Sequence, residues 1–281
     1  MSTNKMDVKQ LRIMANTVRQ DVIRMIAEAK SGHPAGSLGM TDVLVTLYFS
    51  FLKVRPKKPK DPERDYLVLS NGHICPALYA VMANRGFFPK KELMNLRKIG
   101  SRLQGHPHRE ALPGLESSSG PLGCGLSQAA GMALGLKMSG KKNRVVCLTS
   151  DGEHEEGNTW EAVMFAAKYG LDNLIQIMDR NNIQIDGTTD EVMPLRSLKK
   201  KYEAFNWSVI EINAHDIKQI LKALEQADKT KAKPTIIIAK TIPGKGVSFM
   251  ENDYKWHGKA PSREQAEKAI EELKKERLRI R

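Results

Sequence analysis

Two short apolar segments of the chain are each followed by polar turn residues, with a helical pattern between them. The first is Val145–Leu148, ahead of Asp151, and the second is Leu174–Met178, ahead of Asp179. Short runs rich in β-branched residues and bounded by turn residues are typical of strands buried in a parallel sheet. Residues 160–169 predict a helix. Its expected apolar face is formed by Trp160, Val163 and Ala167, with Met164 beside it. The pattern predicts a βαβ unit.

The same reasoning assigns elements to the rest of the chain. Strands are expected at Tyr66–Leu69, Ser208–Ile212 and Thr235–Ala239. Helices are expected at Val8–Lys30, Met40–Phe51, Cys75–Arg85, Lys90–Leu96, Leu126–Met138 and Leu195–Phe205, from a cap at Asn213–Asp216 to Ala227, and at Arg263–Arg281. This alternation predicts an α/β fold, a mostly parallel sheet with helices on both faces. Since no repeat or long linker divides the chain, we expect one domain, residues 1–281, with an N-terminal helix and a charged C-terminal helix.

Composition is that of an ordinary globular protein. The 281 residues are 41% hydrophobic and 27% charged, with no apolar run of transmembrane length. Met1–Lys5 lacks the apolar core of a signal peptide. The cysteines, Cys75, Cys124 and Cys147, have no paired spacing, which favours reduced thiols in a cytoplasmic protein.

The net charge of +13 raises the question of an anionic partner. The lysines are dispersed in small clusters, at 57–60, 90–91, 141–142 and 199–201, and in the C-terminal helix. No RNA-binding signature or aromatic platform accompanies them. We therefore expect solvated surface that attracts sugar phosphates or an acidic partner, and no binding to nucleic acid or membrane.

Polar side chains follow the two strands of the βαβ unit. Asp151 follows the first strand and Asn181 follows the second. Open α/β sheets bind ligands at the carboxyl ends of their strands. Carboxylate, amide and carbonyl oxygens suit Mg²⁺ or Ca²⁺, which also take phosphate oxygens. This edge therefore predicts a metal–diphosphate site.

The spacing of these residues resembles the thiamine diphosphate fingerprint. Asp151-Gly152 is followed by 28 residues (153 to 180) and then by Asn181-Asn182. Either dipeptide alone could belong to an ordinary βα turn, but at this spacing on two strand ends the signal is strong. One departure is Ser150, where the family usually has glycine, so close backbone approach is less assured there.

Further motifs, in family order from about residue 10 to 261, resemble transketolase in particular. A Gly/Pro-rich segment, Ser31–Ser37, is expected as a loop after the first helix. The motifs are Ser31-Gly32-His33-Pro34, Ser70-Asn71-Gly72-His73, Gly105-His106-Pro107, Gly120-Pro121-Leu122-Gly123, the run Lys240–Gly246, and His257–Pro261.

The resemblance implies a role for each matching residue. Asp151, Asn181 and the Ile183 carbonyl would bind the metal. Gly152 and His73 would bind the diphosphate of thiamine diphosphate, together with Asn181. The glycine-flanked start of the helix after Gly123 would also free backbone N–H groups for an anion. His215, by contrast, is expected to be a structural residue at a helix start.

The remaining matches would surround the rest of the cofactor and the sugar. Ile185 would pack against the thiazolium ring, and Glu156 resembles a family glutamate of the subunit interface, where it could share a proton with another buried carboxylate. The cleft would be shaped by Gly120, Leu122 and Gly123. The substrate channel would be lined by His33, His106 and His257, the last also beside the cofactor.

The resemblance further implies a partner. It covers the N-terminal, diphosphate-binding half of transketolases, in which a neighbouring pyrimidine-binding domain supplies the glutamate that protonates the cofactor. We expect the N-terminal subunit of a split transketolase, active with a C-terminal subunit in an α2β2 assembly.

Two alternatives remain open from the sequence. The chain could belong to a related thiamine diphosphate enzyme with another sugar donor, because most contacts to the acceptor phosphate would lie in the other half. It could also be a non-catalytic assembly protein on the same fold that exploits its charge.

Overall fold

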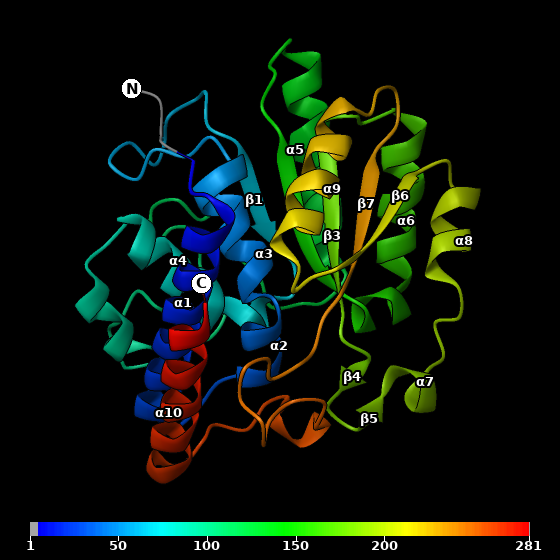
Figure 1. Ribbon diagram of the computed structural model, residues 1–281. Coiled ribbons are helices and arrows are strands. Elements are labelled where there is room, and N and C mark those ends of the chain that lie inside the picture. The colour runs from blue at the N-terminus through cyan, green and yellow to red at the C-terminus, as the bar shows by residue number, and fades with distance from the viewer. Residues whose placement is uncertain (1–4, 281) are drawn as a thin grey trace.

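A five-stranded parallel sheet lies at the centre of the computed structural model, which describes residues 5–280 (Figure 1). The strands are β1 (Tyr66–Leu69), β2 (Val145–Ser150), β3 (Leu174–Arg180), β6 (Ser208–Asn213) and β7 (Thr235–Lys240). They lie in the order β1-β2-β3-β7-β6, and all their pairings are parallel. Every expected strand is present, so the predicted α/β fold is confirmed.

Two hydrophobic cores cover the two faces of the sheet. Successive strand residues point to opposite faces, so Val146 and Leu148 enter one core while Val145 and Cys147 enter the other. The first core contains α1 (Val8–Ala29), α3 (Thr41–Thr46), α4 (Cys75–Arg85) and α9 (Ile217–Lys229). The second contains α5 (Cys124–Met138), α6 (Gly157–Lys168) and α8 (Leu198–Ala204). Helices therefore cover both faces, as expected.

The first helix begins and ends where local side-chain chemistry favours it. Asp7 and Gln10 form a capping box, in which each side chain accepts a hydrogen bond from the other's backbone N–H, at 2.8 and 2.9 Å. Lys30 ends the helix in the left-handed region at φ 52°. The buried Asn16 amide donates to the carbonyl of Leu273 at 2.8 Å and fixes α10 (Arg263–Arg279) against α1. The charged C-terminal helix thus lies on the N-terminal one.

The structure corrects several expected elements in the first half of the chain. The expected loop Ser31–Ser37 turns after His33 into a short helix, α2 (Pro34–Gly39), because proline fits the first helical position. The expected helix Met40–Phe51 is split into α3 and a π-helical turn, η1 (Leu47–Phe51). The expected helix Lys90–Leu96 is a 3₁₀ segment, η3 (Lys90–Asn95).

The apolar face of α6 also differs from the expected one. Because the helix begins at Gly157, its buried stripe consists of Thr159, Ala162, Val163 and Ala166. Met164, expected beside that face, is 58% exposed. Hydrophobicity alone did not distinguish a side chain in the core from one on the surface.

Short segments that the sequence did not predict lie next to the strand ends. They are η2 (Gly72–Ile74), η4 (Gly152–Glu155), β4 (Ile183–Gln184), β5 (Gly187–Thr188), α7 (Thr189–Val192) and η5 (Tyr254–Trp256). Residues 1–4, within the segment expected to lack a signal peptide, and Arg281, the expected end of the last helix, lie outside the described residues. No helix within residues 5–280 has the length and apolar character needed to cross a membrane.

Two glycines of α5 allow a matched test of its packing. A Cβ at Gly125 would lie 2.3 Å from Ser70 Cβ and 2.6 Å from its Cα, whereas a Cβ at Gly131 would meet nothing within 4 Å. We expect Gly125→Ala to lower the free energy of unfolding by about 1–3 kcal/mol through overpacking. Gly131→Ala should raise it by about 0.5–1 kcal/mol, because alanine favours a helix. Urea denaturation measures both, and equal effects would contradict the close approach of α5 to β1.

Candidate functional site

A cavity of about 430 Å³ opens at the carboxyl ends of β1, β2 and β3. All residues expected in the site line it except Gly123. These are His33, His73, His106, Gly120, Leu122, Asp151, Gly152, Glu156, Asn181, Ile183, Ile185 and His257. The other lining residues are Ser150, Glu155, Gln184, Asp186 and Val192. The fold thus gathers residues from positions 33 to 257 around one cavity.

Asp151 is the buried carboxylate of this cavity. It is 1% exposed, follows β2 directly, and its backbone N–H donates to the carbonyl of Asp179 at 3.1 Å. Its Oδ2 accepts from Arg180 Nη1 at 2.9 Å and from the Asn182 N–H at 2.7 Å, and its Oδ1 accepts from the Gly152 N–H at 2.9 Å. Burial raises the pKa of Asp151, and these donors partly oppose that rise.

Asn181 is held by a second buried carboxylate. Its amide nitrogen donates to Asp179 Oδ2 at 2.8 Å, and its Oδ1 accepts from the Ile183 N–H at 3.0 Å. The other oxygen of Asp179 accepts from the Thr241 hydroxyl, on the segment after β7. Burial is the main cause that raises the pKa of Asp179 to about 7. Asp179 therefore fixes the orientation of the Asn181 amide.

The donor atoms at this edge fit a hard divalent cation. Asp151, Asn181 and Ile183 line the same cavity and supply a carboxylate, an amide oxygen and a carbonyl. Asp151 Oδ1 accepts one hydrogen bond from the described residues and keeps lone pairs for a cation. Residues 5–280 contain no cluster of three or more His, Cys, Asp or Glu side chains that could hold a metal. A cation here would depend on the amide and carbonyl oxygens.

Three histidines form a triangle on the opposite wall. The ring centroids of His33, His73 and His257 lie 5.2 to 5.5 Å apart. Burial and then the neighbouring positive groups lower the pKa of His33 to about 4, and the same causes lower the pKa of His73 well below its usual value. Burial also lowers the pKa values of His257 and of nearby His106. At neutral pH these rings are uncharged, so each can both donate and accept hydrogen bonds.

Arg97 links two of the histidine segments and was not identified from the sequence. Its Nη1 donates to Ser31 Oγ at 2.7 Å, two residues before His33. Its Nη2 donates to the carbonyl of Gly105 at 3.3 Å, one residue before His106. Arg97 follows an expected helix with no motif around it, so no sequence pattern indicated this role.

Glu153 is a second residue that sequence reasoning missed. It is fully buried and its Oε1 accepts from the Gly123 N–H at 2.9 Å and from the Ser70 hydroxyl. Its Oε2 accepts from the Ser150 N–H at 2.7 Å. Burial raises the pKa of Glu153. This side chain joins the end of β1, the start of α5 and the end of β2.

The Glu153 contacts change two expectations. The Gly123 N–H, expected to be free for an external anion, is used by the internal carboxylate of Glu153, and Gly123 does not line the cavity. Ser150, which departs from the usual glycine, is accommodated because its hydroxyl faces Glu153 Oε2 at 3.4 Å. The nearby sequence Glu153–Glu156 contains three glutamates, and composition did not indicate which one is buried.

Two other histidines have structural roles. The buried His154 contacts the Ser150 carbonyl through Nδ1 at 2.9 Å and Tyr202 Oη through Nε2 at 2.7 Å, behind the end of β2. His215 Nδ1 lies 2.9 Å from Asp42 Oδ2, and its Nε2 accepts from the Ile242 N–H at 2.8 Å. The structural role expected for His215 agrees with these contacts, although Asp216 makes the helix cap.

The mouth of the cavity carries exposed apolar side chains. Leu122 is 37% exposed, Val192 is 44% exposed and Ile185 is 72% exposed. Glu156, expected at a subunit interface, is also exposed at this mouth. Apolar side chains exposed together around a cleft are typical of surfaces that bind a ligand or another protein.

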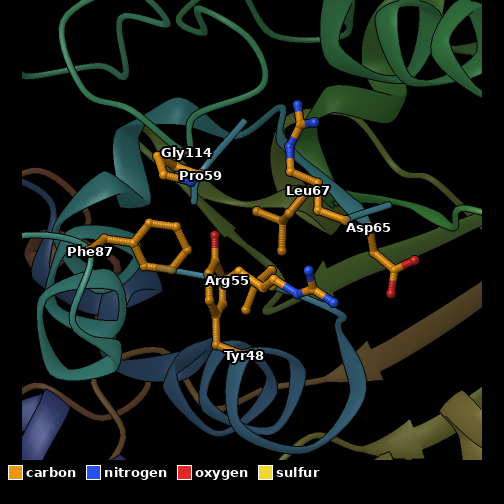
Figure 2. A pocket seen from close by; sticks show the side chains of 9 residues that line it. Tyr48, Arg55, Pro59, Asp65, Leu67, Phe87 and Gly114 are labelled. Carbon is orange, nitrogen blue, oxygen red and sulfur yellow. The ribbon is translucent and has the colours of Figure 1, made fainter. Parts of the chain in front are cut away.

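A separate small cavity lies away from the strand ends. Figure 2 shows Tyr48, Phe87 and Arg55 around it, with Leu67 of β1. Its volume of about 10 Å³ is close to the minimum for one water molecule. It is too small for a metabolite.

Comparisons with known proteins point to one family. The family model described as "Transketolase, thiamine diphosphate binding domain" matches residues 10–277. One of the two subunits named for an apulose-4-phosphate transketolase, from Phocaeicola vulgatus, is 41% identical over 268 residues, 95% of each chain. The 6-deoxy-6-sulfo-D-fructose transketolase subunit SqwG of a Clostridium species is 41% identical over 276 residues, which cover 98% of this chain and 99% of the relative.

A solved structure agrees with these matches. The transketolase of Campylobacter jejuni superposes with a TM-score of 0.90 at 35% identity. The alignment covers 98% of this chain and 46% of that one. The chain thus matches the named subunits almost end to end and spans less than half of the solved transketolase.

The depressed histidine pKa values predict a loss of stability in acid. The pKa of His33 is about 4 in the folded chain and about 6.5 when unfolded, so unfolding takes up a proton between these values. The contribution of His33 to stability is complete above pH 6.5 and declines as the pH falls toward 4. We expect His33→Asn to lessen the decline between pH 7 and 5, by at most about 1.4 kcal/mol per pH unit. Urea denaturation across this range measures it, and parallel pH profiles would refute the burial of a neutral ring.

Proposed function

The chain belongs to the transketolase family, whose thiamine diphosphate-binding domain it contains, and we propose that it is the diphosphate-binding subunit of a two-chain transketolase. The observation that carries this proposal is the convergence of the motif residues on one cavity at the strand ends. In this proposal residues 1–281 form one diphosphate-binding domain.

We assign the metal and diphosphate to the β2–β3 side of the cavity. Asp151, Asn181 and the Ile183 carbonyl would hold Mg²⁺ or Ca²⁺, and Gly152 and His73 would bind the diphosphate. His73 is neutral at pH 7, so it can donate a hydrogen bond to a phosphate oxygen without adding charge. When bound, thiamine diphosphate supplies the nucleophilic carbon that carries a two-carbon unit between sugars.

The protein's own residues would orient the sugar and move its protons. His33, His106 and His257 line the cavity as neutral rings that can exchange protons with sugar hydroxyls. Ile185 would present an apolar surface to the thiazolium ring. Gly120 and Leu122 would bound the cleft on its other side, and Gly123, which does not line the cavity, would support them through Glu153.

A partner subunit would complete the site. The apolar mouth at Leu122, Ile185 and Val192 supports this, as does the naming of two end-to-end relatives as subunits. The partner would supply the pyrimidine-binding domain and its glutamate, with Glu156 at the interface, in an α2β2 assembly. We expect this assembly in the cytoplasm, where the free thiols of Cys75, Cys124 and Cys147 would stay reduced.

The donor sugar has two candidate classes. The first is xylulose 5-phosphate, with ribose 5-phosphate or erythrose 4-phosphate as acceptor, as in the pentose phosphate pathway. The second is suggested by the relatives, which are named for apulose 4-phosphate and 6-deoxy-6-sulfo-D-fructose. All are sugars with an anionic group, which a chain of net charge +13 would attract. A non-catalytic role would leave the convergence of these motif residues on one cavity without a purpose.

Substitution of Asp151 should separate metal binding from catalysis. We expect Asp151→Asn to weaken Mg²⁺-dependent thiamine diphosphate binding by more than about 100-fold, because the ligand charge is lost while its shape is kept. His257→Ala, the matched control in the same cavity, should change binding less than about tenfold, or 1.4 kcal/mol, while turnover falls. Calorimetry on the assembled subunits measures the affinities. Equal loss of affinity in both variants would refute the division of roles.

Activity should depend on a second chain. We expect the purified chain to show no ketol transfer above background with thiamine diphosphate, Mg²⁺ and ribose 5-phosphate. Adding the product of the adjacent reading frame should give activity with xylulose 5-phosphate, apulose 4-phosphate or 6-deoxy-6-sulfo-D-fructose as donor. Turnover by the chain alone would overturn the two-chain proposal, and the preferred donor in the mixture would decide between the two substrate classes.

A further inference from the structure

The carboxylate of Asp151 has a permanent positive charge beside it. Arg180 Nη1 lies 2.9 Å from Asp151 Oδ2, and the two side chains are 20% and 1% exposed. A guanidinium stays protonated at every physiological pH. Next to a cation site such a charge would oppose binding by Coulomb repulsion unless it has another function.

The contacts of Arg180 indicate what that function is. The same Nη1 donates to Thr189 Oγ1 at 2.8 Å. The Thr189 hydroxyl donates to Asn182 Oδ1 at 2.5 Å, and the Thr189 N–H donates to the Asn182 carbonyl at 3.2 Å. The Asn182 N–H in turn donates to Asp151 Oδ2 at 2.7 Å. Arg180 thus joins both ends of the segment 182–189 to Asp151.

This segment has little else to hold it in place. It contains the hairpin of β4 and β5, whose pairing involves only two residues on each side. Ile185 at its tip is 72% exposed. Isolated two-stranded hairpins are at best marginally stable in water. The order of the hairpin therefore depends on the contacts at its base.

Arg180 and a cation would use different oxygens of Asp151. Arg180 and the Asn182 N–H both bind Oδ2, while Oδ1 accepts the Gly152 N–H. A cation bound through Oδ1 leaves the contact with Arg180 intact. The ion pair can therefore persist when a metal binds.

We propose that Arg180 is a positioning residue that closes the β4–β5 hairpin onto Asp151, so that the metal-binding edge is formed before the metal arrives. The inference rests on the proposed function only for the identity of the cation. The hairpin contains Ile183, whose carbonyl is the proposed third ligand. An edge formed in advance lowers the ordering cost of binding and so raises metal affinity.

Hydrogen exchange on the metal-free, full-length chain tests the closure directly. In Arg180→Met, backbone amides of residues 182–189 should exchange about tenfold faster, while those of β2 and β3 keep the wild-type rate. Arg180→Lys, which keeps the charge and one donor, should give an intermediate rate. Unchanged exchange at 182–189 in Arg180→Met would overturn the proposal. If that variant unfolds globally, Arg180→Lys decides, and a wild-type rate in it together with wild-type stability would likewise count against closure by the guanidinium fork.

Arg144→Met is the matched control. Arg144 Nη2 lies 2.6 Å from Asp65, and these side chains are 16% and 1% exposed, so the pair is buried to the same degree. Arg144 precedes β2 and therefore lies at the opposite end of that strand from the cavity. Its substitution should lower global stability without raising exchange at 182–189 relative to β2 and β3. A selective rise there would show that loss of any buried ion pair opens the hairpin.

A Mn²⁺ titration followed by electron paramagnetic resonance tests the consequence for the metal. With thiamine diphosphate present, Arg180→Met should need about tenfold more Mn²⁺ for half-saturation. If Arg180 acted mainly as a competing charge, the variant would need less Mn²⁺, which would overturn the proposal. Absence of Mn²⁺ binding by the wild type would contradict the proposed function, while hydrogen exchange would still decide the role of Arg180.

Discussion

The parallel pairing of β2 with β3 is the constraint on which the site depends. In this register Ser150 lies opposite Asp179, so Asp151 and Asn181, which follow on the two strands, reach the same edge of the sheet. Their oxygens meet there only because both strands run in the same direction. The neighbouring strands β1 and β7 end at the same edge and bring His73 and Thr241 beside them. A slip of one residue would turn these side chains to the opposite face.

Buried polar contacts hold this edge in one conformation. Asp179 joins the end of β3 to the segment after β7, and Glu153 joins the ends of β1 and β2 to the start of α5. A buried carboxylate is tolerated when several donors surround it. Arg97 and Arg180 connect loops rather than cores. The site is therefore defined less by the apolar cores than by a few charged groups, each of which joins two or three segments.

Much of this could be predicted from the sequence, and the remainder has physical reasons. The strands were recognisable because both faces of the sheet are buried, which makes each strand a continuous apolar run. The expected site residues belong to motifs with fixed spacing. Glu153, Arg97 and Arg180 could not be found, because their roles depend on contacts between segments up to 83 residues apart. Met164 was misjudged because exposure is decided by the register of a helix, not by hydrophobicity.

The most direct test of the account is the position of the metal. Crystals of the chain with its partner subunit, grown with Mn²⁺ and thiamine diphosphate, would give an anomalous difference map measured at the manganese edge. The account predicts one peak per chain, within about 2.0–2.3 Å of Asp151, Asn181 Oδ1 and the Ile183 carbonyl, as expected for hard cations on oxygen ligands. A peak at the histidine triangle, or at any other place away from the end of β2, would contradict it.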